Sequence, residues 1–174
     1  YFVEHVEKAI AIPDDVLKAL TPGSCDSEQV ICQLKESFQL DQSSLEQPDC
    51  QTKQLIRCFA RKAKLSNRDD VIIHLRGMTP AGTTGPLLRE NLDVRRISIP
   101  LGRELTIALS GGDQWEIVAE KLGLSPQEIR FLDKRILNPA DALIGYIANQ
   151  RYLSVGELYD VLCDCDLPVV ADLL

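Results

Sequence analysis

The chain is poor in aromatic residues and in histidine. Only 5% of its 174 residues are Phe, Trp or Tyr, and its two histidines are His5 and His74. Few aromatic rings leave few surfaces on which nucleic-acid bases could stack. Two distant histidines offer little material for a nucleophile with a neighbouring base, and the sequence has no glycine-rich phosphate loop, Gly-x-Ser-x-Gly or zinc-protease motif. We therefore expect no catalysis and no nucleic-acid partner.

Long apolar runs and an excess of basic charge are absent as well. No stretch approaches the roughly 18 apolar residues of a membrane-spanning helix, and the start of the chain lacks the layout of a signal peptide. The formal net charge of -7 argues against coating phosphates or an anionic membrane. These features predict a cytoplasmic protein without a membrane partner.

Cysteine is present without the pattern of a disulfide scaffold or a metal site. Six cysteines in 174 residues are too sparse for a small secreted framework. Cys32 and Cys58 fall on apolar helical faces, so we expect them to be reduced core residues. Cys163 and Cys165 have no second cysteine pair or nearby histidine to complete four ligands, so we expect neither metal nor cofactor.

The apolar residues recur at helical spacing in both halves of the chain. Ser125-Pro-Gln-Glu128 and Ser154-Val-Gly-Glu157 have the pattern of capping boxes, and Asn138-Pro-Ala-Asp141 is a third helix start. The pattern predicts six helices in residues 99–174. It predicts five in residues 1–78, beginning with a stripe from Phe2 to Ile10, and leaves a sixth open, either in residues 20–25 or around Leu45.

Glycine and proline concentrate between the two halves. Residues 77–86 contain three Gly and two Pro, a composition typical of linkers. We predict an all-α protein of two small six-helix bundles, residues 1–77 and 98–174, joined by a linker at residues 78–97. Leu87, Leu88 and Leu92 are more apolar than a free linker requires.

The second half resembles a death domain. The resemblance rests on Gly112-Asp-Gln-Trp-Glu-Ile-Val-Ala-Glu-Lys-Leu-Gly-Leu124, on the two Ser-x-x-Glu helix starts and on the exit Leu162 to Leu173. It implies that Trp115, Ala119 and Leu122 belong to the core of a six-helix bundle, which agrees with their spacing on one helical face.

The first half resembles a death-effector domain, a sister fold. Arg68-Asp69-Asp70-Val71, near the end of this half, is similar to that family's Arg-x-Asp-Leu signature, with Val at the apolar position. The resemblance implies that Arg68 and Asp70 pair with an acid on the second helix, for which Asp14 and Asp15 are the candidates. A plain charge pair at a helix start is the alternative reading.

An effector domain followed by a death domain is similar to the Fas-associated death domain adaptors and their invertebrate relatives. The resemblance implies a non-catalytic adaptor in apoptosis or innate immune signalling. Its death domain would bind a death-domain receptor or adaptor, and its effector domain would recruit an initiator caspase through a death-effector prodomain. Clustering would raise the local concentration of the caspase, and self-assembly fits the same scheme.

Two charged faces are candidate partner surfaces, each with an ordinary solvated surface as the alternative. The first is the basic face of residues 51–68, a docking surface for an acidic helix. The second is the mixed and acidic surface of the death-domain half, because helical assemblies need two different surfaces on each subunit. The basic face comprises Lys53, Arg57, Arg61, Lys62 and Lys64. The death-domain face comprises Arg130, Asp133, Lys134, Arg135, Asp160, Asp164 and Asp166.

A second interpretation treats the chain as the C-terminal regulatory part of a larger receptor or scaffold. In that case residues 99–174 are a death domain, and the first half is a private helical module that packs against it. The apolar residues of the linker favour this alternative. Cleavage near Thr79–Pro86 into two folded pieces would favour the adaptor.

Overall fold

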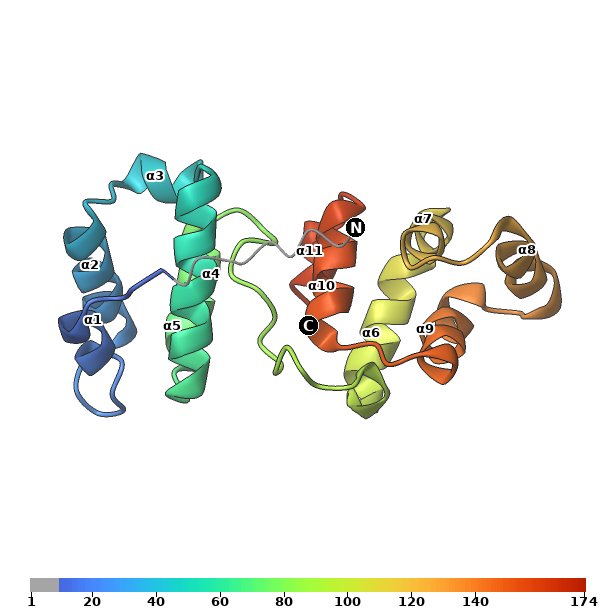
Figure 1. Ribbon diagram of the computed structural model, residues 1–174, viewed down its shortest axis with the longest axis horizontal. Helices are drawn as coiled ribbons and strands as arrows, with labels where there is room; N and C mark the ends of the chain where they lie inside the picture. Colours follow the sequence, from blue (N-terminus) through green and yellow to red (C-terminus); the bar gives the residue numbers. More distant parts are fainter. Residues whose placement is uncertain (1–9) are drawn as a thin grey trace. The chain divides into compact units, whose positions relative to one another are not determined.

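The structure is a computed structural model that describes residues 10–174. Within this range the chain contains eleven α-helices and one 3-10 turn, with no strand. It divides into two compact units, Tyr1–Gly85 and Pro86–Leu174 (Figure 1). The all-α class is as predicted. The stripe expected from Phe2 to Ile10 lies, apart from Ile10, outside the described residues.

The helices of the first unit begin at local capping signals. The carboxylates of Asp26, Asp41 and Asp49 accept hydrogen bonds from the backbone N–H three residues ahead, at 2.8, 2.7 and 2.7 Å. A short helix does lie around Leu45, the second of the two places left open by the sequence. The described helices of this unit are α1 (Asp14–Ala19), α2 (Ser27–Phe38), α3 (Gln42–Glu46), α4 (Cys50–Leu65) and α5 (Asp69–Met78).

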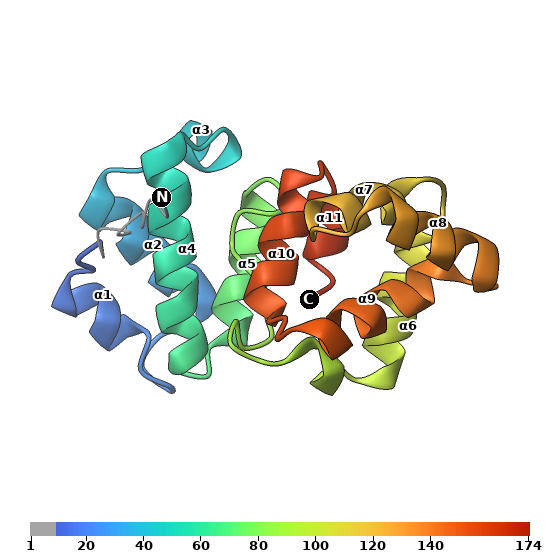
Figure 2. The same ribbon diagram turned by 45° about the vertical axis from the view of Figure 1, so that its right-hand side comes forward.

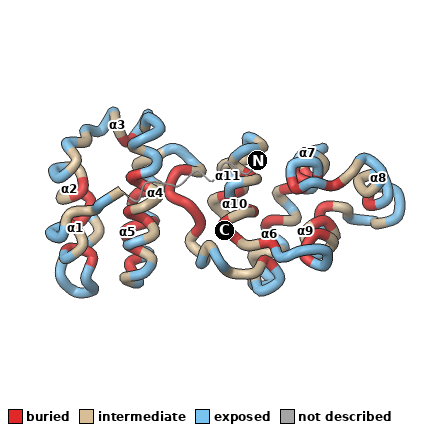
Figure 3. Tube along the Cα trace, viewed as in Figure 1, coloured by how far each residue is buried: buried red, intermediate tan, exposed pale blue. Residues whose placement is uncertain are grey.

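The core of the first unit forms where α5 packs against α2 and α4, with α1 packed on α2. Buried positions recur every three or four residues along these helices, as amphipathic helices require (Figure 3). The fully buried large side chains come from α2, α3, α4 and α5, together with Leu20, the residue that follows α1. They are Leu20, Ile31, Leu34, Leu45, Ile56, Phe59, Ile72 and Leu75.

The second unit has three helix starts that the sequence predicted. Ser125 forms a complete capping box with Glu128, and Asn138 accepts a hydrogen bond from the N–H of Asp141. Ser154 caps its helix too, but Glu157 turns away from the reciprocal bond and pairs with Arg151 at 2.8 Å. The elements are η1 (Val94–Arg96), α6 (Ile99–Leu109), α7 (Gln114–Lys121), α8 (Pro126–Arg135), α9 (Pro139–Gln150), α10 (Val155–Asp164) and α11 (Pro168–Ala171) (Figure 2).

The core of the second unit is built around α9, which contacts α6, α7, α8 and η1, while α11 closes over α10 and α6. Trp115 and Ala119 on α7, together with Leu122 just after it, are buried in this core at 6%, 0% and 7% exposure. Gly123 ends α7 with φ +95°, which lets the N–H of Leu124 bond back to Ala119.

Residues 88–94, which we call the strap, are part of the second unit. Their backbone runs beside residues 153–156: Val94 N–H donates to Leu153 O, Val155 N–H to Leu92 O and Gly156 N–H to Glu90 O, at 2.8 to 3.0 Å. Leu88 N–H donates to the carbonyl of Leu174 at 2.9 Å. The segment expected as a linker, 78–97, is therefore packed in place over much of its length. Its leucines and its backbone have partners in the second unit.

The strap ends in a charge-stabilised turn. Asp93 caps η1 through the N–H of Arg95 at 2.9 Å, and its carboxylate holds the Arg95 guanidinium at 2.6 Å. These bonds from Arg95 hold the pKa of Asp93 at about 2. The turn is therefore charged, and its bonds are intact, throughout the neutral pH range.

The cysteines correct one expectation. All six are free thiols. Cys32 is exposed on α2 and Cys58 is only partly buried on α4, so neither is a core residue. The apolar stripe of α2 runs through Val30, Ile31 and Leu34, and Cys32 faces away from it.

Candidate functional site

The end of α4 and the start of α5 place Arg68 at a sharp turn. Asn67 adopts φ +56°, and the N–H of Arg68 bonds back to Ala63 O at 2.8 Å, a motif that closes a helix with a left-handed residue. Arg68 is the residue before α5, and its side chain does not cap that helix. The turn therefore directs the guanidinium inward, where Arg68 is only 6% exposed.

Arg68 and Asp70 form a two-pronged ion pair. Nε of Arg68 donates to Oδ1 of Asp70 at 2.9 Å, and Nη2 donates to Oδ2 at 3.0 Å. The Asp70 side chain keeps 53% of its surface exposed. The hydrogen bonds from Arg68 hold the pKa of Asp70 below its usual value, and the same bonds raise the pKa of Arg68.

Outside the pair, the charge of Asp26, the residue that caps α2, also acts on Arg68, with a smaller effect than the hydrogen bonds and the charge of Asp70. The negative charge of Asp26 helps to raise the pKa of Arg68, and its own carboxylate caps α2. Asp14 and Asp15, the expected candidates, lie exposed in the first turn of α1. Among the residues that the structure describes, no acceptor lies within hydrogen-bond distance of the buried Nη1 of Arg68.

A second contact joins the same two helices. Ser27 Oγ and His74 Nδ1 lie 3.1 Å apart, linking the first residue of α2 to the middle of α5. On the neighbouring surface Ile73 is 59% exposed, and Leu65 at the end of α4 is 80% exposed. Asp70 and Ile73 lie three residues apart on α5, and Leu65 is the last residue of α4. Sequence reasoning missed the contact between Ser27 and His74, because the two residues stand 47 positions apart.

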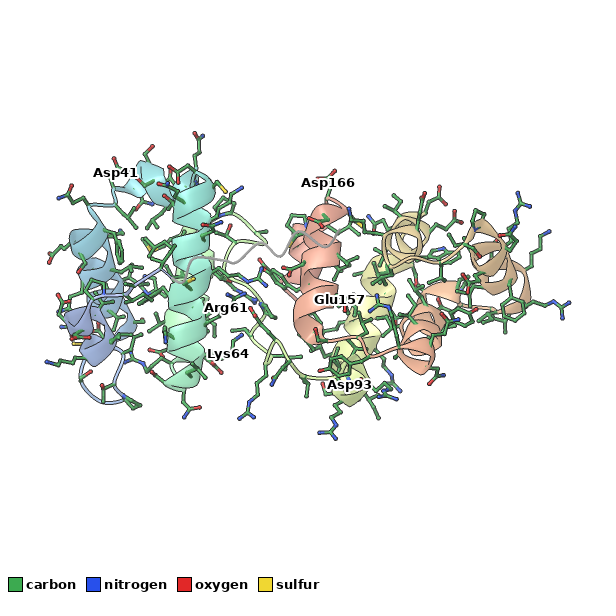
Figure 4. All side chains as sticks on the ribbon, viewed as in Figure 1. Asp41, Arg61, Lys64, Asp93, Glu157 and Asp166 are labelled. Carbon is green, nitrogen blue, oxygen red and sulfur yellow. The ribbon has the colours of Figure 1, made fainter. Side chains whose placement is uncertain are left out.

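The basic face lies along α4. Lys53 and Lys62 are exposed. Arg57, Arg61 and Lys64 recur at intervals of four and three residues, which places them along one side of the helix, and Figure 4 shows Arg61 and Lys64 projecting from that side. The five cations thus occupy one helix of 16 residues that contains no acid.

In the second unit the expected partner residues fall on two different helices. Arg130, Asp133, Lys134 and Arg135 are all exposed on α8. Beside them lie two exposed apolar side chains, Phe131 at 51% and Leu137 at 108%. This end of α8 is therefore a mixed surface of basic and apolar groups.

Two of the three expected acidic residues, Asp160 and Asp164, line a groove along α10. Asp160 and Asp164 are exposed, and Asp166 lies just beyond the helix end with φ +59°. The groove has a volume of about 560 Å³, and Glu90 of the strap and Glu157 line it together with Asp160 and Asp164. Sequence reasoning missed Glu90, because only the folded strap brings it beside α10, and it interpreted Glu157 only as part of a capping box.

Comparison with protein-family models, with curated proteins and with solved structures finds no match for this chain. None of the helices in residues 10–174 is both long and apolar enough to cross a bilayer. Within the same residues no group of three or more His, Cys, Asp or Glu side chains is arranged to hold a metal ion. The functional argument therefore depends on the surfaces just described.

Proposed function

We propose that the chain is a non-catalytic signalling adaptor of the death-fold type, acting in apoptosis or innate immune signalling. Its second unit binds an upstream death-domain receptor or adaptor. Its first unit recruits an initiator caspase through the caspase's death-effector prodomain. The observation that carries the proposal is the Arg68–Asp70 pair, a buried guanidinium that fixes a half-exposed carboxylate on the outside of a small helical unit.

The geometry of this pair suits recognition. Two parallel hydrogen bonds fix the orientation of the carboxylate, so little side-chain freedom is lost when a partner binds it. The apolar side chains of Leu65 and Ile73 supply surface that a partner helix can cover. The cations of α4 add a face that would attract an acidic helix.

The second unit supports the other half of the proposal. Six α-helices follow η1, with Trp115 buried on the second of them and Ser125 capping the third, in the order that the resemblance implies. The two different exposed surfaces, on α8 and on α10, are what an assembly with head-to-tail contacts needs. The division into two compact units at Gly85 favours the adaptor over a single integrated module.

The experiment measures binding of the full chain to a tandem death-effector prodomain. Arg68→Ala combined with Asp70→Ala is expected to weaken binding at least about tenfold, because the oriented carboxylate is lost. Lys35→Ala combined with Asp69→Ala is the matched control, since it removes one base and one acid from α2 and α5 outside the pair. If the folded double variant binds as the wild type does, the proposed face is wrong.

A further inference from the structure

The outer side of α8 exposes two large apolar side chains. α8 packs mainly against α7 and α9, and in Figures 1 and 2 it lies at the edge of the second unit. Phe131, within this helix, is 51% exposed. Leu137, in the connection from α8 to α9, is 108% exposed, so almost none of its surface is covered by a neighbour. This edge of the unit therefore holds apolar surface that folding leaves in water.

Three cations lie around Phe131. Arg130 precedes it, and Lys134 and Arg135 follow at three and four residues, the intervals that place side chains next to one another on a helix. All three cations are exposed, and none forms an ion pair or a side-chain hydrogen bond with another residue in the part of the chain that the structure describes. Asp133 is the one acid between them. The local surface thus combines apolar groups with unpaired positive charge.

We propose that this surface binds a membrane whose headgroups include anionic lipids. We call the surface the α8 tip, and its residues are Arg130, Phe131, Lys134, Arg135 and Leu137. In the bound state the two apolar side chains enter the boundary between headgroups and acyl chains, and the three cations contact the anionic headgroups. The contact is peripheral, so it requires no membrane-spanning helix.

The net charge of the whole chain does not decide this contact. The value of -7 sums the charges of 174 residues, whereas at physiological salt a charge acts on a membrane surface only within about 8 Å of it. Among the residues from Arg130 to Leu137, three are basic and one is acidic. The part of the chain that would touch the lipid is therefore positive, although the chain as a whole is acidic.

The shape of the α8 tip favours a lipid surface over a folded protein partner. A protein partner must offer a cavity that matches a side chain as protruding as Leu137. Acyl chains rearrange around an apolar group of any shape, and the headgroups form a continuous layer of charge that cations meet without a fixed register. The observed mixture of protruding apolar groups and unpaired cations thus needs no further feature to suit a bilayer.

The contact is weak and reversible, because it has two apolar groups and three cations. Each cation near an anionic surface contributes about fivefold to the affinity, and this part is lost at high salt. The inference goes beyond the proposed function, since it requires neither a receptor nor a caspase. A chain held by its α8 tip leaves the acidic surface of α10 available to a protein partner, and it is concentrated at the membrane where receptors lie.

The experiment measures co-sedimentation of the full chain with lipid vesicles. Wild type is expected to bind vesicles of phosphatidylcholine and phosphatidylserine at a ratio of about 7:3 in about 0.05 M NaCl. Binding should be at least about tenfold weaker to phosphatidylcholine alone, and also in about 0.5 M NaCl. Two variants, each checked by circular dichroism, should weaken binding to the mixed vesicles at least about tenfold. They are Phe131→Ser with Leu137→Ser, and Arg130→Gln with Lys134→Gln and Arg135→Gln.

Each variant has a matched control elsewhere on the surface. Ile99→Ser with Ile107→Ser removes two apolar side chains of α6 that are 73% and 72% exposed. Lys18→Gln with Lys53→Gln and Arg103→Gln changes the net charge as much as the triple variant of the α8 tip does, at three exposed cations of other helices. Both controls should bind the mixed vesicles as the wild type does. A wild-type chain that stays in the supernatant at low salt, or α8-tip variants that bind no more weakly than their controls, overturns the proposal.

A fluorescent probe locates the contact. Trp115 is buried in the core, so a second Trp placed at the surface reports on its own surroundings. The emission of Leu137→Trp should move to shorter wavelength when the mixed vesicles are added, because the indole leaves water. Ile107→Trp, at a comparably exposed position on α6, should show no such change. Vesicle binding without a change in the emission of Leu137→Trp would place the contact elsewhere and contradict the proposal.

Discussion

Arg68 is the residue on which the first unit's candidate face depends. A buried guanidinium destabilises a fold unless its charge is paired and its donors are satisfied. Asp70 takes two of the donors of Arg68, at 2.9 and 3.0 Å, while Nη1 finds no acceptor among the described residues. The carboxylate of Asp70 is thus a structural counter-ion and an exposed group at once. A change at Asp70 is therefore expected to act on stability as well as on the proposed recognition.

Replacement of Asp70 by Asn is expected to destabilise the first unit at neutral pH. The amide has about the same size, but it removes the negative charge and leaves Arg68 with poorer acceptors. We expect a loss of about 1 kcal/mol in the free energy of unfolding, reduced from the value for a fully buried pair because the Asp70 side chain is 53% exposed. Urea unfolding of Asp70→Asn and wild type at pH 7 measures the difference.

Asp69→Asn is the control for this prediction. Asp69 also lies in the first turn of α5, so both variants lose the same favourable interaction with the helix N-terminus. Because the pKa of Asp70 is lowered in the fold, the stabilisation it contributes is present above the unfolded pKa of about 3.9 and is lost as the pH falls through the folded pKa. Wild type and Asp70→Asn should therefore converge as the pH falls through the lowered pKa of Asp70 in the fold. Equal effects of the two variants at pH 7 would contradict the prediction.

The residues of this pair could be predicted from the sequence, but their neighbours could not. Arg68 and Asp70 stand two residues apart, so a short sequence motif is enough to predict the pair. Asp26 approaches Arg68 only because α2 packs against α5, and its position before Gln29 indicates a helix cap and nothing more. Asp14 and Asp15 also stand at a helix start, and the sequence contains no signal that separates them from Asp26 as the partner acid.

At the scale of single elements, a helix start depends on contacts with nearby residues, whereas the strap depends on contacts with distant ones. The cap residues Ser125 and Asn138 bond to groups three residues away, which is why the sequence predicts where α8 and α9 begin. The strap bonds to residues between 59 and 86 positions further along the chain, from Val94 with Leu153 to Leu88 with Leu174. The leucines of the strap indicated that this segment packs against something. No sequence pattern indicates the distant backbone to which the strap bonds.

Gly156 is the point at which the strap is most sensitive to a side chain. A Cβ at this position would lie 3.0 Å from Glu90 Cβ and 3.1 Å from Glu90 O. The backbone oxygen cannot move aside without loss of its bond from the N–H of Gly156. Gly156→Ala is therefore expected to destabilise the second unit by about 1–3 kcal/mol, as judged from chemical denaturation.

The matched control is Gly145→Ala on α9, where a Cβ would have nothing within 4 Å. There the higher helix propensity of Ala should stabilise the unit by up to about 1 kcal/mol. The two substitutions are chemically identical. Changes of opposite sign in the free energy of unfolding would therefore show that the close approach of the strap causes the difference. A Gly156→Ala variant as stable as the wild type would show that the strap can shift without loss.

At the scale of the whole molecule, the chain changes from one unit to the next at Gly85. The glycines and prolines of residues 77–86 indicated this region, but composition could not show that its second half is held in place. Arg76 Nη2 donates to Gly85 O at 2.9 Å, Arg76 Nε donates to Thr84 Oγ1 at 3.2 Å, and Thr83 and Thr84 are buried. Between the end of α5 at Met78 and Pro86, only Pro80 and Ala81 are exposed. The connector is therefore a short anchored turn instead of a free linker.

Arg76→Ala is expected to open this turn to proteases. Elastase, which cleaves after small side chains, should cut the wild-type chain slowly after Ala81, because the flanking backbone must leave its hydrogen bonds before it fits a protease cleft. Without Arg76 the bonds to Thr84 and Gly85 are lost, and cleavage at this site should be several-fold faster. The control is Arg96→Ala, which removes an exposed arginine outside the connector. Elastase should cleave this variant at the wild-type rate. Gel analysis with mass spectrometry of the fragments gives the rate and the site, and equal rates for Arg76→Ala and Arg96→Ala would show that Arg76 does not anchor the connector.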